Sequence, residues 1–392
     1  MGRKLLEVAV EPEVLLWARE SMGFGVKDVA HKMKAAESTI IKLESGQKKP
    51  TVTQLERLAE VYKRPLAAFF LPRPPREQPM PKDFRSLPED RKAPLSAETR
   101  LAMRRARRLQ SLATELTGGL ERQIDVKIGG IDLSKDPEVV AVETRRQLRV
   151  EVHTQFHWKD EYVAFSEWKK VIERCGIFVF QLSMALEDGI RGFSVIEGGY
   201  PAIVLNLRDK TRGRIFSLFH EYGHLALNHS GICDMGDQEH LHGEGRKVEI
   251  FCNHLAGAIL VPRDALLSQD VIESRKYSRD WPDKALNKLA NRFKVSREVI
   301  LRRLVLLELA DRNFYKRKRE EWQETELAKE EKRGKIRRNP PRECIRNNGA
   351  PFVSLVLESH RRERITYRDV ADYLDVGLKH LPAVEQHIRG KA

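Results

Sequence analysis

The chain has 392 residues, and its 71 Lys plus Arg against 57 Asp plus Glu give a formal net charge of +14. This length fits two or three domains, and the basic excess suits a negatively charged partner, although solubility alone also explains it. No apolar run approaches the ~18 residues that cross a bilayer, and glutamates interrupt the short apolar patch at the N-terminus, which argues against a secretory signal. Four cysteines without a CxxC pair argue against a disulfide framework and a thiolate zinc finger. We therefore expect a cytoplasmic protein.

The N-terminal segment has the pattern of a small all-helical domain. Residues 12–70 read as five short helices. The middle two, Val26–Met33 and Glu37–Glu44, are joined by a turn at Lys34 and present apolar residues to each other. A third amphipathic run at Thr53–Tyr62 places its apolar residues on one face. The pattern predicts a helix-turn-helix pair with a supporting helix.

The stretch VKDVAHKMKAAESTIIKLESGQKKPTVTQLERLAEVYKRPLAAFFLP resembles the XRE-type helix-turn-helix family. The likeness rests on the L-E-S-G-x-x-x-P-T segment and the L-x-x-L-A-x-x-Y run, and it covers nearly all of residues 15–72. It implies that the second helix of the pair lies in the major groove of DNA with its N-terminal side chains at base edges. The residues expected nearest DNA are Glu37, Ser38, Thr39 and Lys42, with Lys48 and Lys49 meeting phosphates from the following loop.

Three positions depart from that family's usual pattern. Lys34 stands at the turn position usually held by glycine, and Ala36 stands where a hydroxyl N-cap is usual, which costs ~1 kcal/mol. Glu37 brings a negative charge to a surface that phosphates approach. The alternative is a helix-turn-helix domain used for protein contact or dimerisation.

Prolines dominate the next segment and predict an extended linker over residues 73–98. A helical pattern follows at 99–122, and a further helix is predicted at Arg212–His229. Between these helices lie short runs rich in Val, Ile and Phe. They predict three strands, Gly176–Leu182, Ile190–Ile196 and Ala202–Leu207.

The sequence His220-Glu221-Tyr222-Gly223-His224 is an H-E-x-x-H motif. On a helix, residues four apart share a face, so both imidazoles can converge on one metal ion. Apolar residues surround the motif, which predicts a buried helix, and buried histidines beside a glutamate are costly unless something uses them. The alternative is a pair of core histidines satisfied by hydrogen bonds.

A catalytic zinc needs a third protein ligand and an open position. The metzincin extension is absent, because Leu227 and Ser230 replace its glycine and histidine. A glutamate from the following helix, Lys247–Pro262, is the other solution. Glu249 and Asn253 share a face of that helix, so Glu249 is the expected third ligand and Asn253 the partner that reaches back to a ligand histidine.

Three pieces of this region, RGFSVIEGGYPAIVLNL, RGRIFSLFHEYGHLALNH and EIFCNHLAGAILVP, resemble the ImmA/IrrE family of metallopeptidases, and the likeness continues into LNKLANRFKVSREVILRRL. It spans roughly residues 160–310. It implies a zincin-like zinc endopeptidase in which His220, His224 and Glu249 bind Zn²⁺ and Glu221 is the catalytic acid/base. Members are implied to cut DNA-binding repressors and so switch on genes.

The sequence does not decide which side chain stabilises the oxyanion of the reaction. The candidates are His229, His240, His242, Tyr222 and Tyr200.

The overall expectation is an α+β, mostly helical protein with a helix-turn-helix domain, a peptidase domain with a small three-stranded sheet, and a small helical C-terminal unit. The expected segments are 1–72 for the helix-turn-helix domain, 73–98 for the linker, 99–315 for the peptidase domain, 316–346 for a charged helix and linker, and 347–392 for the C-terminal unit.

The expected function is a DNA-binding regulator that cleaves a repressor or antitoxin-like protein to derepress genes. The alternative is a transcriptional regulator whose peptidase-like domain senses a ligand or stress without proteolysis. The expected partners are DNA, that protein substrate and a second copy of the chain in a homodimer, with no membrane.

Overall fold

The structure is a computed structural model. It describes residues 6–75, 82–83, 95–120, 124–196, 199–228, 231–233, 243–275, 279–330 and 339–390. The chain divides into two compact units. The first comprises Met1–Met80 and Arg91–Arg105, and the second Pro81–Asp90 and Ala106–Ala392. Among the described residues, no helix combines the length and apolar character needed to cross a membrane.

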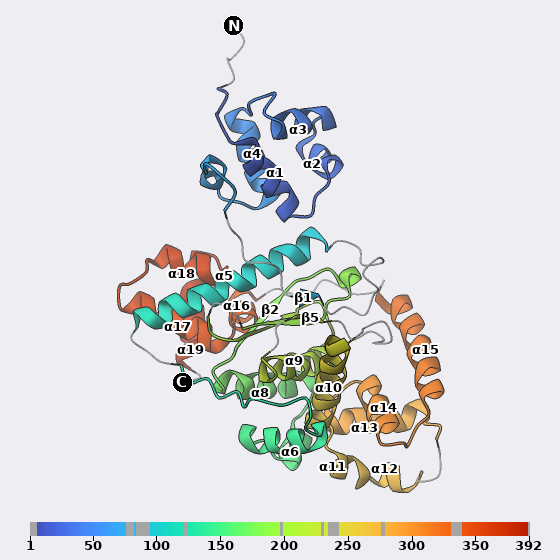
Figure 1. Ribbon diagram of the computed structural model, residues 1–392. Helices are drawn as coiled ribbons and strands as arrows, with labels where there is room; N and C mark the ends of the chain where they lie inside the picture. The colour runs from blue at the N-terminus through green and yellow to red at the C-terminus, as the bar shows by residue number, and fades with distance from the viewer. Residues whose placement is uncertain are drawn as a thin grey trace. The chain divides into compact units, whose positions relative to one another are not determined.

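The first unit contains the short helices that the sequence predicts (Figure 1). They are α1 (Pro12–Ser21), α2 (Val26–Met33), α3 (Glu37–Glu44), α4 (Val52–Tyr62) and the 3-10 helix η1 (Leu66–Phe70). Their apolar faces meet in one core that includes Leu15, Val29, Ile40 and Leu58. The helix-turn-helix arrangement predicted from the sequence is confirmed.

The turn between α2 and α3 has a backbone conformation that is costly for a residue other than glycine. Lys34 ends α2 in the left-handed conformation, with φ of 51°. A residue with a Cβ pays about 1 kcal/mol or more there, and glycine does not. Ala36 precedes α3 without a side-chain cap. By contrast, Thr51 caps α4 and exchanges hydrogen bonds with Gln54.

One ion pair links α1 to α3 inside the first unit. Arg19 Nε donates to Glu44 Oε1 at 2.8 Å, and the two side chains are only 13% and 10% exposed. Arg19 Nη1 also donates to the carbonyl of Phe24 at 2.8 Å. The pair therefore holds the first helix of the unit against the end of the helix expected to read DNA.

The second unit is built on one mixed sheet with the strand order β1-β5-β3-β4-β2. Its strands are β1 (Lys82–Asp83), β2 (Phe178–Leu182), β3 (Gly192–Val195), β4 (Ala202–Asn206) and β5 (Gly231–Cys233). The three predicted strands are confirmed as the neighbours β3, β4 and β2. Strands β1 and β5 extend the sheet, and their two or three residues are too short to show a period in the sequence. β2 is parallel to β4, β3 is antiparallel to both β4 and β5, and β1 is parallel to β5.

The other elements of the second unit are helices (Figure 1). They are α5 (Ala97–Gly119, whose first residues belong to the first unit), α6 (Pro137–Leu148), α7 (Val152–His157), α8 (Glu161–Arg174), η3 (Leu186–Asp188), α9 (Thr211–Ala226), α10 (Gly243–Leu260), α11 (Arg263–Leu267), α12 (Asp270–Glu273), α13 (Asp283–Phe293), α14 (Arg297–Leu306), α15 (Arg312–Glu330), α16 (Pro340–Asn348), α17 (Ala350–Arg361), α18 (Tyr367–Leu374), η5 (Leu378–His380) and α19 (Leu381–Arg389).

Both faces of the sheet are covered, which explains why its strands are continuous apolar runs. Val179 of β2 belongs to the core that includes α8 and α9. The neighbouring Phe178 and Phe180 point to the other face, where their rings lie 6.2 and 5.5 Å from that of Phe352 in α17. Successive residues of a strand alternate between faces. The C-terminal helices thus complete the second unit.

Three of the predicted segment boundaries fall inside helices. The boundary at residue 98 lies in α5, the one at 315 lies in α15, and the one at 346 lies in α16. The carbonyl of Arg346 accepts hydrogen bonds from Lys169 of α8 and Gln181 of β2. These contacts tie α16 to the sheet, although its sequence reads as a charged connector. The five predicted segments themselves stay predictions.

Candidate metal centre

Helix α9 carries the H-E-x-x-H motif through the middle of the second unit. It begins shortly after β4, and every residue from Ile215 to Ala226 is buried. The ring of Phe219 meets Trp168 of α8 edge to face at 4.8 Å. A helix that is buried on all sides must satisfy its polar side chains inside the fold. The contacts made by the side chains of the motif therefore indicate the function of this helix.

Helix α10 approaches α9 closely at a glycine. A Cβ placed on Gly223 would lie 3.1 Å from Cys252 Sγ and 3.4 Å from Cys252 Cβ. A larger residue at position 223 would push the helices apart. The x-x positions of the motif thus contribute to the close packing that brings Glu249 of α10 to the two histidines of α9.

Three side chains converge between these helices. His224 Nε2 lies 3.1 Å from Glu249 Oε1, and His220 Nε2 lies 3.4 Å from Glu249 Oε2. The two Nε2 atoms are themselves 3.1 Å apart. All three side chains are at most 2% exposed. Among the described residues, this is the group of His, Cys, Asp and Glu side chains that can hold a metal ion.

The donor set and its spacing fit a zinc ion. Two ligands bound about 2.0–2.1 Å from one tetrahedral ion lie about 3.3–3.4 Å apart. The separations of the two Nε2 atoms and the carboxylate oxygens match that value within a few tenths of an ångström. Two imidazoles and one carboxylate are also a donor set of catalytic zinc sites. A cation between them would compensate the burial of the Glu249 charge.

Asn253 lies one turn beyond Glu249 on α10. Its Oδ1 is 3.1 Å from His220 Nδ1. An amide oxygen only accepts hydrogen bonds, so in the neutral ring the proton sits on Nδ1 and the lone pair of Nε2 faces Glu249. The contact orients the ring and selects the tautomer that binds a metal.

Glu221 lies beside the cluster, against strand β3. A Cβ placed on Gly192 would be 3.5 Å from Glu221 Oε1 and 3.0 Å from the carbonyl of Val204, so glycine leaves room for the carboxylate. Glu221 Oε2 is buried, and no described residue donates a hydrogen bond to it. Burial, reinforced by the charge of Glu249, raises the pKa of Glu221 to about 8, against the opposing effects of His220 and Ser194.

The ionisation of the cluster follows from its contacts. Burial alone lowers the pKa of His220 and raises that of Glu249. Their mutual attraction reverses both effects, so the pKa of His220 is raised and that of Glu249 is held far below its ordinary value. Glu249 is therefore the permanent carboxylate of the cluster, and Glu221 is the one that can exchange a proton near neutral pH.

A second polar group anchors α10 and has no signature in the sequence. Glu138 of α6 accepts from His254 at 2.6 Å and from Arg303 Nη2 of α14 at 3.0 Å. Arg303 is 1% exposed and also donates to the carbonyl of Val261 at 3.0 Å. More than a hundred residues separate Glu138 from either partner, so no local pattern reveals the group. It binds three helices together behind the metal centre.

The candidates for an oxyanion donor are only partly described. His229, His240 and His242 lie outside the described residues. Tyr222 is two positions from His220, which places it on the opposite side of α9. Tyr200 Oη accepts from the backbone N–H of Ile124, and its ring packs on Phe178, on the sheet face away from α9. Neither tyrosine points at the cluster.

The expected DNA-contacting residues of the first unit are accessible. One of them, Thr39, is half-buried. The others are exposed, namely Glu37, Ser38, Lys42, Lys48 and Lys49. Ile41, on the same helix, is 53% exposed and was not among the predicted contacts. An apolar side chain on that surface is able to touch a thymine methyl group.

Comparison with known families assigns both regions. Residues 172–305 match the peptidase family M78, described as the IrrE N-terminal-like domain. Residues 15–69 match a helix-turn-helix family. The first match contains the whole His220, His224 and Glu249 cluster, and the second contains α2 and α3. No curated protein matched the chain.

Proposed function

We propose that this chain, which joins a helix-turn-helix domain to an IrrE N-terminal-like peptidase domain, is a cytoplasmic DNA-binding regulator with zinc-dependent endopeptidase activity. It cleaves a repressor or antitoxin-like protein and so derepresses genes. The observation that carries the proposal is the buried convergence of His220, His224 and Glu249, with the free carboxylate oxygen of Glu221 beside it.

His220, His224 and Glu249 would hold Zn²⁺, which would supply Lewis-acid polarisation of a scissile carbonyl and of water. Asn253 keeps the His220 ring in the binding tautomer through its 3.1 Å contact. The low pKa of Glu249 keeps it anionic throughout.

Glu221 performs the proton transfers. It accepts a proton from the attacking water and passes it to the leaving amine. A general base works best when its pKa lies near the working pH, and burial moves the pKa of Glu221 in that direction by raising it above its ordinary value. Gly192 keeps the space beside Glu221 open.

The helix-turn-helix domain brings the peptidase to DNA. Helix α3 carries the exposed Ser38 and Lys42 for base contacts, and Lys48 and Lys49 follow for phosphates. The net charge of +14 supports a polyanionic partner. Helix-turn-helix proteins commonly bind two half-sites as dimers, which supports a homodimer on DNA.

Metal analysis tests the centre itself. Purified wild-type protein should contain about one zinc per chain, and His220→Ala should contain almost none. His254→Ala is the matched control, because His254 lies on α10 and pairs with Glu138 instead of the cluster. Equal zinc in the wild type and His220→Ala would remove the metal assignment.

Proteolysis needs a separate test. The zinc-loaded protein should be incubated with the repressor encoded beside its gene, and the products identified by intact mass. We expect a single cleavage that a chelator abolishes and added zinc restores. A protein that binds zinc in full, yet leaves such repressors intact while the gene still responds, would instead be a sensor.

A further inference from the structure

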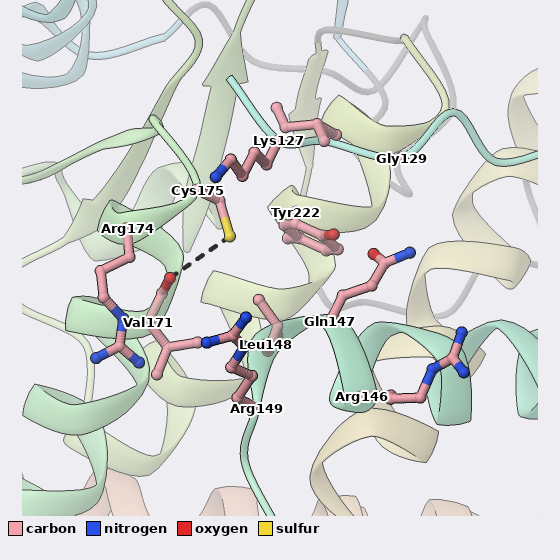
Figure 2. Close-up of a pocket in the computed structure, with 11 residues that line it drawn as sticks. Lys127, Gly129, Arg146, Gln147, Leu148, Arg149, Val171, Arg174, Cys175 and Tyr222 are labelled. Carbon is pink, nitrogen blue, oxygen red and sulfur yellow. Dashed lines mark hydrogen bonds between the residues drawn. The ribbon is translucent and has the colours of Figure 1, made fainter. Parts of the chain in front are cut away.

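A large basic pocket opens on the side of α9 away from the candidate metal centre. It has a volume of about 1110 Å³, and all of its lining residues belong to the second unit. Three chain segments form its wall: the loop at residues 127–129, the end of α6 and the end of α8. Figure 2 shows Tyr222 of α9 at the centre of these segments, next to Cys175, whose thiol donates to the carbonyl of Val171 at 3.5 Å.

The lining is strongly and uniformly positive. Lys127, Arg146, Arg149 and Arg174 all line the pocket, and none of its lining residues is acidic. Lys127 forms an exposed ion pair with Asp125 at 3.2 Å. Within the described part of the chain, the three arginines form no ion pair with any acidic residue. Four cations therefore surround one concavity whose lining includes no acidic residue.

The partial negative charges at the helix ends do not neutralise this positive charge. Arg146 and Arg149 lie at the carboxyl end of α6, and Arg174 lies at that of α8. Each helix end carries about half a negative charge, which attracts cations. Two such ends balance about one of the four positive charges. Lys127 comes from a loop and has no helix end of its own to complement.

The chemistry of the lining indicates the class of ligand. A guanidinium presents paired N–H donors that match phosphate oxygens, and three of the four cations are arginines. Ile128, Leu148 and Val171 provide apolar wall, and the ring of Tyr222 provides an aromatic surface. Pockets for small molecules and cofactors usually measure about 300–1,000 Å³, so this one exceeds the needs of inorganic phosphate.

We propose that this pocket binds a small organic phosphate, of the size and charge of a nucleoside diphosphate or triphosphate. The phosphates lie among the arginines and Lys127, and the organic part lies against the apolar wall and Tyr222. Because Tyr222 sits between His220 and His224 in the sequence, the ligand contacts the motif helix from its opposite face. The binding claim itself is independent of zinc and of proteolysis.

Calorimetric titration of the full chain with ADP tests the proposal. The double variant Arg146→Gln/Arg174→Gln should weaken ADP binding at least about tenfold, equivalent to about 1.4 kcal/mol. The matched control is Arg312→Gln/Arg368→Gln, which removes the same charge from exposed positions outside the pocket. The control should bind ADP like the wild type, and it also accounts for any chelation of zinc by ADP.

Two further probes separate the ligand classes. Inorganic pyrophosphate should bind more weakly than ADP, because it cannot use the apolar wall, and equal binding of both would overturn the organic part of the proposal. A polyglutamate peptide that binds while ADP does not would assign the pocket to an acidic protein partner. Equal ADP affinity in the two double variants, with unchanged thermal unfolding, would remove the site.

Discussion

The helix expected to contact DNA and the helix that carries the H-E-x-x-H motif differ in how far they are buried. In α3 of the first unit, only Ile40 and Leu43 are buried, and the residues expected to meet DNA are solvent-accessible. In α9 of the second unit, every residue from Ile215 to Ala226 is buried, including the whole H-E-x-x-H motif. A surface that reads DNA depends little on the rest of the fold, whereas a buried metal centre exists only because other elements supply its partners. Substitutions at the exposed positions of α3 should therefore change binding alone, and those around α9 should couple function to packing.

The largest expected effect is that of Glu221→Gln. Glutamine keeps the shape but cannot accept a proton, so cleavage of the target repressor should fall about 10²–10⁴-fold. Zinc content and DNA binding should stay as in the wild type. Steady-state kinetics with metal analysis provide the measurement. Glu249→Gln is the companion variant, and it should lose zinc first and activity as a consequence.

In cells, the Glu221→Gln variant should leave the regulated gene uninduced. Reporter expression under the inducing condition measures this outcome. A normal response would show that proteolysis is not the switch and would favour the sensor function.

The next effect concerns the ion pair that links α3 to α1. Glu44→Gln removes the ionised partner of Arg19 Nε, while Arg19 keeps its hydrogen bond to the Phe24 carbonyl, so the loss of a charged hydrogen bond should cost up to about 3 kcal/mol. Amide hydrogen exchange over residues 12–62 should show the loss of protection. Glu37→Gln, at an exposed position on the same helix, should leave exchange unchanged. Equal effects of the two variants would contradict the contrast between buried and exposed positions.

A third prediction tests the polar group behind the metal centre. Burial opposes ionisation of Glu138, but hydrogen bonds from His254 and Arg303 lower its pKa from 4.5 to about 2. A lowered pKa stabilises the folded state above about pH 4.5, and this stability is lost as the pH falls towards 2. Glu138→Gln should therefore lower the free energy of unfolding at pH 7 by on the order of 2–3 kcal/mol.

The pH dependence is the diagnostic measurement for Glu138→Gln. Urea titrations at several pH values should show a smaller loss of stability between pH 4.5 and 2 in the variant than in the wild type. Parallel curves for the two proteins would mean that Glu138 does not titrate with the predicted shift.

The smallest effect is expected on the DNA-contacting surface. Replacing Lys48 and Lys49 by alanine should reduce the slope of log affinity against log salt by about 0.9 for each lost phosphate contact. Binding should weaken alike for all DNA sequences, and stability should stay within about 0.5 kcal/mol. Fluorescence anisotropy at several salt concentrations measures both affinity and slope. A large loss of stability would mean that this loop supports the fold.

The sequence by itself determined the features that depend on local period and spacing. The helices of residues 12–70 and the shared face of His220 and His224 follow from the helical period of 3.6 residues. The three main strands follow from short runs rich in Val, Ile and Phe. The turn at Lys34 was also predicted, and the family likeness marked it as a position usually held by glycine. Tyr222 was kept as an oxyanion candidate, although its spacing of two residues from His220 already places it on the opposite side of a helix.

Only the tertiary structure decided which distant residues meet. Glu249 reaches the two histidines because Gly223 lets α10 approach α9. Gly192 of β3 makes room for Glu221 of α9, and Glu138 joins α6 to α10 and α14. The basic pocket likewise gathers three segments around α9. A local pattern records how one segment folds, but such contacts arise from the packing of segments far apart in the chain, which no local period encodes.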